Sequence, residues 1–278
     1  MSALRIGFLV GRPYKETSLS VLPMVMRVLA DAGVTVQTVA GKGRLVDLSA
    51  IRPEHDLYVL KQISGISLSM AGALHAQGAT IVNPYPVTVV LYDKVVATRT
   101  LEAAGVPTPA TYVVSQPEFL LPLLKDGPLV VKPSNGTGGY GVRVVRNEAE
   151  LVAEPLPNGK IPILAQRYHP PEGRDEKIYV IGERVFGVKK TFPARTEAEK
   201  HGEPFTPSEE QCDIALRCGR VFGIDLFGVD FIRSEGKLYV VDMSSIPGFK
   251  GVPNAPALLA DYFHAAAARA AYGEAVPA

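Results

Sequence analysis

The chain has 278 residues, of which 47% are hydrophobic and 21% are charged, a balance typical of a globular protein with a sizeable core. Its 29 basic and 28 acidic residues give a net charge of +1, so nothing favours a nucleic-acid or anionic-membrane partner. The two cysteines, Cys212 and Cys218, support neither a disulfide framework nor a zinc site.

Strands and helices alternate over the first 85 residues. The opening run, MSALRIGFLVGRPYK, predicts a strand rather than a signal peptide, and no run is long enough to span a membrane, so we expect a cytoplasmic protein. Strands are predicted over 4–10, 34–40, 56–61 and 79–84, and helices over 18–33 and 66–78. Such alternation is typical of a doubly wound parallel sheet.

The pattern changes after residue 85. The predicted elements are a helix over 92–105, a strand within 106–114, a glycine-rich hairpin within 129–145, a short helix beginning at Asn147, a strand over 161–169, two antiparallel strands within 175–192, a helix over 208–223, a hairpin over 225–248 and a helix over 254–271. The polar stretch 193–205 has too few apolar residues to be buried and predicts a mobile loop.

The segment VVKPSNGTGGYGVRVV, residues 130–145, contains the G-x-G-x-x-G spacing of a dinucleotide-binding turn. That turn requires a helix to follow the glycines, whereas here a second β-rich run follows, so NAD binding is not expected. A hairpin tip of this kind can place backbone N–H groups over phosphate oxygens. By itself, the pattern is equally compatible with a flexible hairpin that binds nothing.

The last hairpin predicts two facing carboxylates. With a three-residue turn over 235–237, counting back along both strands places Asp230 opposite Asp242. Carboxylates paired across strands repel one another unless a cation lies between them. Mg²⁺ suits the position, because it takes few carboxylates and completes its shell with water and phosphate oxygens. A one-residue shift in register would instead separate the two side chains.

Several lysines accompany these features. Lys132 lies in an apolar strand, where a lysine is expected to face an anion, and Lys94 opens a helix. In the strand pair 175–192, alternation predicts Lys177 and Lys189 on one face and Lys190 on the other. Together with the glycine loop and the acid pair, the lysines indicate a nucleoside-triphosphate site with Mg²⁺. No P-loop or protein-kinase motif set is present.

With these pieces in this order, the sequence resembles the RimK-like ATP-grasp enzymes, a group of ribosomal-protein glutamate ligases, amino-acid ligases and related inositol-polyphosphate kinases. The resemblance is strongest over 83–252, in the segments NPYPVTVVLYDKVVATRTLEAAGVPTPAT, LVVKPSNGTGGYGV, ILAQRYHPPEGRDEKIYVIG and FGVDFI…LYVVDMSSIPGFKGV. It implies an α/β ATP-grasp fold, in which an N-terminal doubly wound parallel domain (1–85) precedes two α+β subdomains (86–168 and 169–278) that sandwich the nucleotide.

The resemblance also implies the roles of individual residues. Phosphate contacts would come from Lys94, Lys132, Gly136, Thr137, Gly138, Gly139, Tyr140 and Gly141, adenine contacts from Gln166, Arg167 and Tyr168, a ribose contact from Asp175, and metal contacts from Asp230, Asp242 and Ser244. Arg167 stands where the family usually has an acid, so adenine would be held mainly by backbone groups. Ser244 replaces the usual asparagine and has a shorter reach.

The implied reaction is the phosphorylation of a carboxylate by ATP, followed by attack of an amine on the acyl phosphate to give an amide. Lys177 or Lys189 would stabilise the acyl phosphate, with Mg²⁺ or Mn²⁺ as the metal. The substrates would be small molecules or peptides that carry a carboxylate and an amine. The sequence is compatible with a homo-oligomer. Two alternatives are a small-molecule kinase, disfavoured by the balanced charge, and a non-catalytic nucleotide-binding module, disfavoured by the presence of both aspartates.

Overall fold

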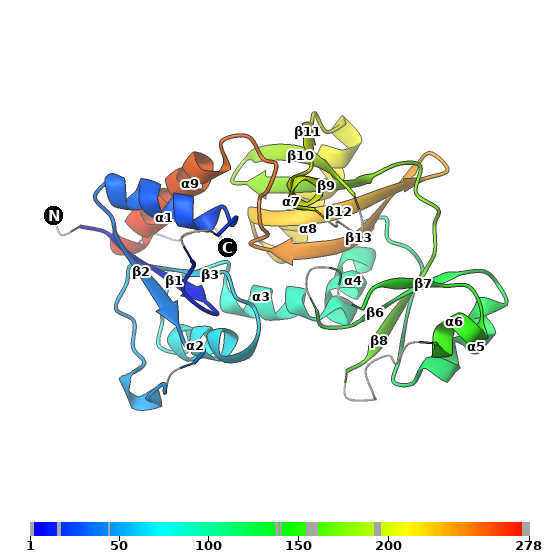
Figure 1. The fold of residues 1–278 in the computed structure, drawn as a ribbon. Coiled ribbons are helices and arrows are strands. Elements are labelled where there is room, and N and C mark those ends of the chain that lie inside the picture. The colour runs from blue at the N-terminus through cyan, green and yellow to red at the C-terminus, as the bar shows by residue number, and fades with distance from the viewer. Residues whose placement is uncertain are drawn as a thin grey trace.

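The computed structural model describes residues 3–15, 18–43, 45–136, 139, 141–153, 161–191 and 196–273, which build three sheets (Figure 1). The N-terminal sheet has the order β2-β1-β3-β4, and every pair in it is parallel. Its elements are β1 (Arg5–Val10), α1 (Leu22–Asp31), β2 (Thr35–Ala40), the 3₁₀ turn η1 (Leu48–Ala50), β3 (Leu57–Leu60), α2 (Gly65–His75) and β4 (Ile81–Val82). The predicted parallel sheet is confirmed.

Helices cover both faces of this parallel sheet, because alternate residues of each strand point to opposite sides. Phe8 packs with α1 residues such as Val25, whereas its neighbour Leu9 packs with α2 residues such as Met70. Both faces of β1 are therefore apolar, as expected of a strand buried on both sides.

The second sheet is small and antiparallel, in the order β5-β8-β6-β7. It comprises β5 (Thr111–Val114), η2 (Pro117–Leu120), α5 (Leu121–Leu124), β6 (Leu129–Pro133), β7 (Arg143–Val145), α6 (Glu148–Val152) and β8 (Ile163–Arg167). Since β6 and β7 are antiparallel neighbours, the glycine-rich segment joins two strands of a hairpin rather than opening a helix.

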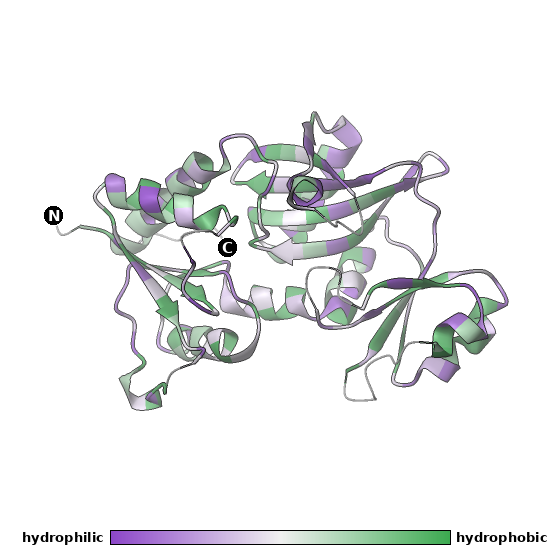
Figure 2. Cartoon of the chain, viewed as in Figure 1, coloured by the Kyte–Doolittle hydropathy of each residue, from purple (hydrophilic) through white to green (hydrophobic). Residues whose placement is uncertain are grey.

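The third sheet is larger and also antiparallel, in the order β11-β10-β9-β12-β13. Its strands and helices are β9 (Asp175–Ile181), β10 (Arg184–Lys190), α7 (Glu197–His201), β11 (Glu203–Phe205), α8 (Glu209–Phe222), β12 (Leu226–Ser234) and β13 (Lys237–Ser245). Helix α8 packs on one face. Figure 2 shows hydrophobic residues where these strands approach the last helix, α9, and hydrophilic residues toward their other ends.

The polar stretch predicted as a loop over 193–205 is ordered from residue 196 onward, so that prediction is wrong there. A capping box between Thr196 and Glu199 starts α7, and β11 adds a fifth strand by pairing with β10. Residues 192–195 lie outside the described residues. The segment is thus stabilised by helix capping and by pairing at the edge of the sheet, and not by burial of apolar side chains.

Two helices connect the first sheet to the other two. Helices α3 (Tyr85–Tyr92) and α4 (Lys94–Ala103) follow one another, where a single helix over 92–105 was predicted. Asp93 separates them and caps α4, because its carboxylate accepts from the Val95 N–H at 3.0 Å. Just before α3, Asn83 is buried and its amide donates to the Leu226 carbonyl at 2.7 Å and to Ser245 Oγ at 3.0 Å.

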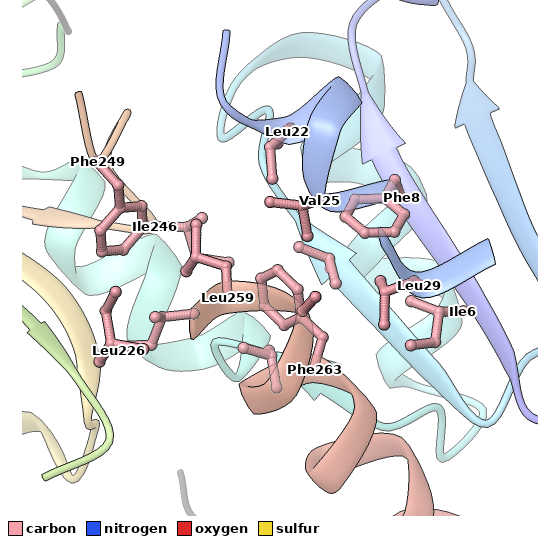
Figure 3. Close-up of a cluster of buried hydrophobic side chains, with 14 of the residues drawn as sticks. Ile6, Phe8, Leu22, Val25, Leu29, Leu226, Ile246, Phe249, Leu259 and Phe263 are labelled. Carbon is pink, nitrogen blue, oxygen red and sulfur yellow. The ribbon is translucent and has the colours of Figure 1, made fainter. Parts of the chain in front are cut away.

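The last helix, α9 (Ala255–Ala271), returns to the N-terminal sheet. Leu259 and Phe263 of α9 pack against α1 and β1 on one side and against Leu226 and Ile246 of the large-sheet region on the other (Figure 3). One apolar core therefore holds the first sheet against the third. None of the helices in the described ranges combines the length and apolar character needed to cross a bilayer.

Asn83→Ala is expected to lower the free energy of unfolding by about 1–3 kcal/mol, because it leaves buried hydrogen-bonding groups without partners. Chemical denaturation measures this change. Asn147→Ala is the matched control: Asn147 is an exposed cap of α6, and its loss costs about 0.5–1 kcal/mol. Wild-type stability of Asn83→Ala would show that this junction does not tie the sheets together.

Candidate active site

Three polar side chains form one row across the large sheet. Lys177 on β9 lies opposite Asp230 on β12, and Asp230 lies opposite Asp242 on β13. Residues opposite one another in an antiparallel sheet project from the same face. The predicted pairing of the two aspartates is therefore confirmed.

The pairing arises by a different register from the one assumed. The turn contains only Glu235 and Gly236, both with positive φ, and a bulge shifts the register between Asp230 and Phe231. The shorter turn and the bulge offset one another, so that Asp230 still faces Asp242. The bulge also leaves Val241 without a partner opposite it in the ladder.

Each aspartate has its own lysine. The Lys94 ammonium lies 2.6 Å from both carboxylate oxygens of Asp242, and the Lys177 ammonium lies 2.7 Å from Asp230 Oδ1. Lys94 reaches the sheet from the first turn of α4, where its backbone N–H donates to the Ser134 carbonyl at the end of β6. The repulsion between the facing carboxylates is thus offset by two side-chain cations.

Lys132 on β6 is the third lysine of this region. It is buried, and its ammonium donates to the Val241 carbonyl at 2.8 Å, which the bulge on β13 makes accessible. Burial lowers the pKa of Lys132 to about 8; Asp242 opposes this shift and Lys94 adds to it. This lysine therefore contacts a backbone carbonyl of β13 rather than the anion expected from the sequence, and it does not pack in the small sheet's core.

Charges around the row set the state of its carboxyl groups. Burial alone would raise the pKa of Asp242, but Lys94 and Lys132 outweigh it and hold that pKa below its ordinary value, so the group is ionised near neutral pH. Asp175, at the start of β9, behaves differently: burial and the nearby Asp230 raise its pKa to about 6. The pKa of Lys177 is raised because Asp230 outweighs the effect of burial.

The predicted faces of the lysines on β9 and β10 are wrong. Lys177 lies opposite Val188, and Lys189 lies opposite Glu176, so Lys177 and Lys189 project from opposite faces. Lys189 is half-buried, 3.7 Å from Glu176, with its ammonium over the Phe205 ring. A two-residue turn pairs residues of opposite parity, which places an even-numbered residue of β10 on the face of Lys177.

Lys190 takes the position that was assigned to Lys189. Its ammonium and that of Lys177 each lie 5.8 Å from the centre of the Tyr179 ring. It also donates to the carbonyls of Lys200 at 2.7 Å and Lys250 at 3.2 Å. Burial and Lys177 lower the pKa of Lys190 to about 8.

The glycine-rich loop is described only in part, since Thr137, Gly138 and Tyr140 lie outside the described residues. Gly139 and Gly141 have φ of 76° and 73°, a conformation that favours glycine. A Cβ on Gly141 would lie 3.0 Å from the Pro133 ring, whereas one on Gly136 would meet nothing within 4 Å. The glycine at 141 is therefore required by the local fold, and open space adjoins Gly136.

The strand predicted to hold adenine splits its side chains between two faces. Gln166 shares the face of Lys132 and is buried, with its amide donating to Thr111 Oγ1 at 3.1 Å. Arg167 projects from the other face, and its side chain donates to the Gly127 carbonyl at 2.7 Å. The Arg167 and Tyr168 N–H groups donate to Ala110 and Pro128 carbonyls.

The donors around the aspartate pair fit Mg²⁺. Ser244 lies opposite Gly228 and projects from the same face as Asp242. In the part of the chain that the structure describes, no group of three or more His, Cys, Asp or Glu side chains is placed to hold a metal ion. Two carboxylates and a hydroxyl suit an ion that completes its shell with water and phosphate oxygens.

Lys190 was predicted on the face opposite Lys177 but shares its face, and Lys61 was not singled out from the sequence as a member of this region. Lys61 directly follows β3, and its ammonium donates to the Ile246 carbonyl at 2.7 Å; burial and Lys177 lower its pKa to about 8. A lysine at the carboxyl end of a buried parallel strand is a readable signal, because ligands of parallel sheets bind at that edge.

Comparison with known families decides the ancestry of this arrangement. The model of the RimK-like ATP-grasp domain matches residues 92–258. The chain belongs to that family. The match spans α4, the glycine-rich hairpin, the Lys177–Asp230–Asp242 row and the start of α9, and it confirms the resemblance predicted from the sequence.

Individual relatives agree with this family. A protein of Alkalilimnicola ehrlichii named "Probable alpha-L-glutamate ligase" is 30% identical over 175 residues, which cover 59% of this chain and 58% of that protein. The chain thus spans less than two thirds of this relative's length.

Solved structures confirm the ATP-grasp fold. D-cycloserine synthetase DcsG aligns with a TM-score of 0.72 at 18% identity, over 96% of this chain and all of that one. The ATP-grasp ligase PsnB, solved with a minimal precursor, Mg and ADP, aligns with a TM-score of 0.68 at 16% identity, over 95% of this chain and 98% of that one.

Asp242→Asn is expected to lower the stability of the ligand-free protein by about 1–3 kcal/mol at pH 7, because it leaves the Lys94 ammonium without its anion. The pKa of Asp242 is depressed in the folded state, so its stabilising effect is present above the ordinary value of 3.8 and is lost as pH falls below it. The difference in unfolding free energy between wild type and Asp242→Asn should therefore be smaller at acidic pH.

Denaturation of this variant at pH 7 and pH 3 measures both effects. Asp213→Asn is the control, since Asp213 pairs with Arg217 on the surface and should contribute less than about 1 kcal/mol. An Asp242→Asn protein as stable as wild type at pH 7 would contradict a stabilising Lys94–Asp242 pair.

Proposed function

We propose that this protein is an ATP-dependent carboxylate–amine ligase that forms an amide or peptide bond through an acyl phosphate. The observation that carries the proposal is the Lys177–Asp230–Asp242 row, closed from the other side by Lys94 of α4 and Lys132 of the small sheet. The lysines suit the phosphates of ATP and the aspartates suit a divalent cation, so the row can serve as a phosphoryl-transfer site.

The triphosphate would lie between the glycine-rich hairpin and β12–β13. In this arrangement Lys94 and Lys132 contact phosphate oxygens, together with N–H groups of the 136–141 loop. Gln166 lies on the Lys132 face of the small sheet and would contact adenine together with backbone groups near Tyr168. Asp175 lies on the Lys177 face of the large sheet, where it would accept a hydrogen bond from the ribose.

Asp230, Asp242 and Ser244 would hold Mg²⁺, or Mn²⁺ in its place. The bound ion would neutralise phosphate charge and bring the transferred phosphoryl group to the row. Lys94 already satisfies Asp242, so metal binding is expected to release the Lys94 ammonium toward the phosphates. The lysine would then exchange one anion for another without leaving a buried charge unpaired.

The reaction proceeds in two steps. An oxygen of the substrate carboxylate attacks the γ-phosphorus of ATP, the bond between that phosphorus and the β–γ bridging oxygen breaks, and ADP leaves with the electron pair. The amine nitrogen then attacks the acyl carbon, the C–N bond forms, and phosphate leaves with the electrons of the C–O bond while the nitrogen loses a proton. Positioning and charge stabilisation supply the catalysis.

Lys177 would stabilise the acyl phosphate. Its ammonium adjoins Asp230 on the site face, whereas Lys189 lies on the other face and has no part in this proposal. The substrates are proposed to be small molecules or peptides that carry a carboxylate and an amine. The relative is named a glutamate ligase, which supports an amino acid as either the carboxylate substrate or the amine substrate.

The function is tested by incubating the protein with ATP, Mg²⁺, hydroxylamine and a panel of carboxylic acids, including amino acids and short peptides. Hydroxylamine traps an acyl phosphate as a hydroxamate, so the assay needs no knowledge of the natural amine. Formation of hydroxamate and ADP in equal amounts supports the ligase. A phosphorylated hydroxyl compound would indicate a kinase, and ADP formation with no hydroxamate from any acid would overturn the acyl-phosphate pathway.

Lys177→Met is expected to reduce kcat for hydroxamate formation by at least about 100-fold, because it removes the cation beside the transferred group. Lys189→Met is the matched control, one strand away on the opposite face, and should retain wild-type kcat. Equal reductions of kcat in the two variants would contradict the proposal that only the Lys177 face of the sheet takes part in catalysis.

A further inference from the structure

Lys61 is a cation whose charge is not matched by a carboxylate. Its ammonium donates one hydrogen bond, to the Ile246 carbonyl at 2.7 Å. Within the described ranges no carboxylate lies at ion-pair distance from it, whereas Lys94 and Lys177 each have an aspartate. An ammonium has three donors, so two remain for a ligand.

The surroundings of Lys61 add further positive charge near its ammonium. The charged group that acts on it is the Lys177 ammonium, and burial and this like charge together lower the pKa of Lys61. Pro247, next to Ile246, and the Lys177 side chain both adjoin Gly228, where a Cβ would lie 3.0 Å from Pro247 and 3.1 Å from Lys177. Lys61 therefore adjoins the Lys177 end of the row, not the Lys94 end.

The position in the fold also points to a ligand. In the order β2-β1-β3-β4, the chain passes from β1 to β2 on one side and from β3 to β4 on the other. The topological switch point, where the strand order reverses, therefore lies between β1 and β3. Lys61 follows β3 directly, and Gly11, which follows β1, is adjacent to Gln62. Ligands of open parallel sheets bind at the carboxyl ends of the strands at such a point.

We propose that Lys61 binds a second carboxylate of the acid substrate, so that the protein acts on dicarboxylic acids or on peptides that carry a further acidic group. The inference rests on the proposed function: while one carboxylate is activated beside Lys177, the second lies at the switch point on Lys61. A carboxylate fits better than a phosphate, because the single positive charge of one ammonium balances the single negative charge of a carboxylate. A phosphate would leave excess negative charge at the site.

The competing explanation is structural. Ile246 has a φ of 29°, a strained value for a β-branched residue, and the Lys61 bond to its carbonyl helps to hold that turn. A loss of this support would slow the reaction with every acid alike. Selectivity between charged and neutral acids is therefore the informative measurement, since a structural role does not change it.

The test compares L-glutamate with L-glutamine and L-aspartate with L-asparagine in the hydroxylamine assay, together with γ-glutamyl and C-terminal acidic dipeptides and their amides. Wild type is expected to prefer the charged member of at least one pair by about 10- to 100-fold in kcat/KM. Lys61→Met should remove that preference, Lys61→Arg should retain most of it, and Lys189→Met should leave it unchanged.

The outcomes separate the two proposals. If wild type forms hydroxamates but uses charged and neutral members equally, or if Lys61→Met slows both members by the same factor, the Lys61 subsite is wrong and the ligase function stands. If no acid of the panel gives a hydroxamate, the ligase function fails and the subsite fails with it.

Discussion

The arrangement of this site depends on the register of three neighbouring strands, β9, β12 and β13. That register sets Lys177, Asp230 and Asp242 side by side on one face of an antiparallel sheet. Two carboxylates at cross-strand distance would destabilise the sheet unless cations lay beside them. The structure provides Lys177 within the row and Lys94 from outside it, so the position of α4 contributes to the stability of the row.

Placement of α4 in turn joins the three sheets. Lys94 is bonded through its backbone to the end of β6 and through its side chain to β13. It follows α3, and Asn83, two residues before the start of α3, is bonded to β12 and β13. The 246–252 segment and α9 hold the large sheet to the first sheet by apolar packing. Polar contacts thus fix the Lys94 side of the row, and apolar packing fixes its Lys61 side.

Much of this was predictable from the sequence. Alternating strands and helices predicted the parallel sheet, and the β-rich run after the glycines predicted a hairpin instead of a dinucleotide-binding turn. The pairing of Asp230 with Asp242 was predicted although the turn was counted one residue too long, because a bulge compensated for it. Nothing in the local sequence shows such a bulge, since it depends on neighbouring strands.

Other errors had different physical origins. The faces of Lys189 and Lys190 were exchanged, because they are determined by pairing across the two-residue turn of Gly182 and Glu183 and not by alternation along each strand alone. The Thr-x-x-Glu pattern of Thr196 and Glu199 is a readable signal for a helix start, but the prediction for this stretch used only its polar composition. Lys61 could not be connected to Lys177 from sequence, because their proximity depends on packing between the first and third sheets.

The central claim is that the two lysine–aspartate pairs are the place where ATP and Mg²⁺ bind. A crystal structure with Mg²⁺ and a non-hydrolysable ATP analogue tests it most directly. We expect metal on Asp230 and Asp242, phosphates against Lys94 and Lys132, and a Lys94–Asp242 separation longer than the present 2.6 Å. Nucleotide bound elsewhere, with both pairs intact and no metal on either aspartate, would contradict it.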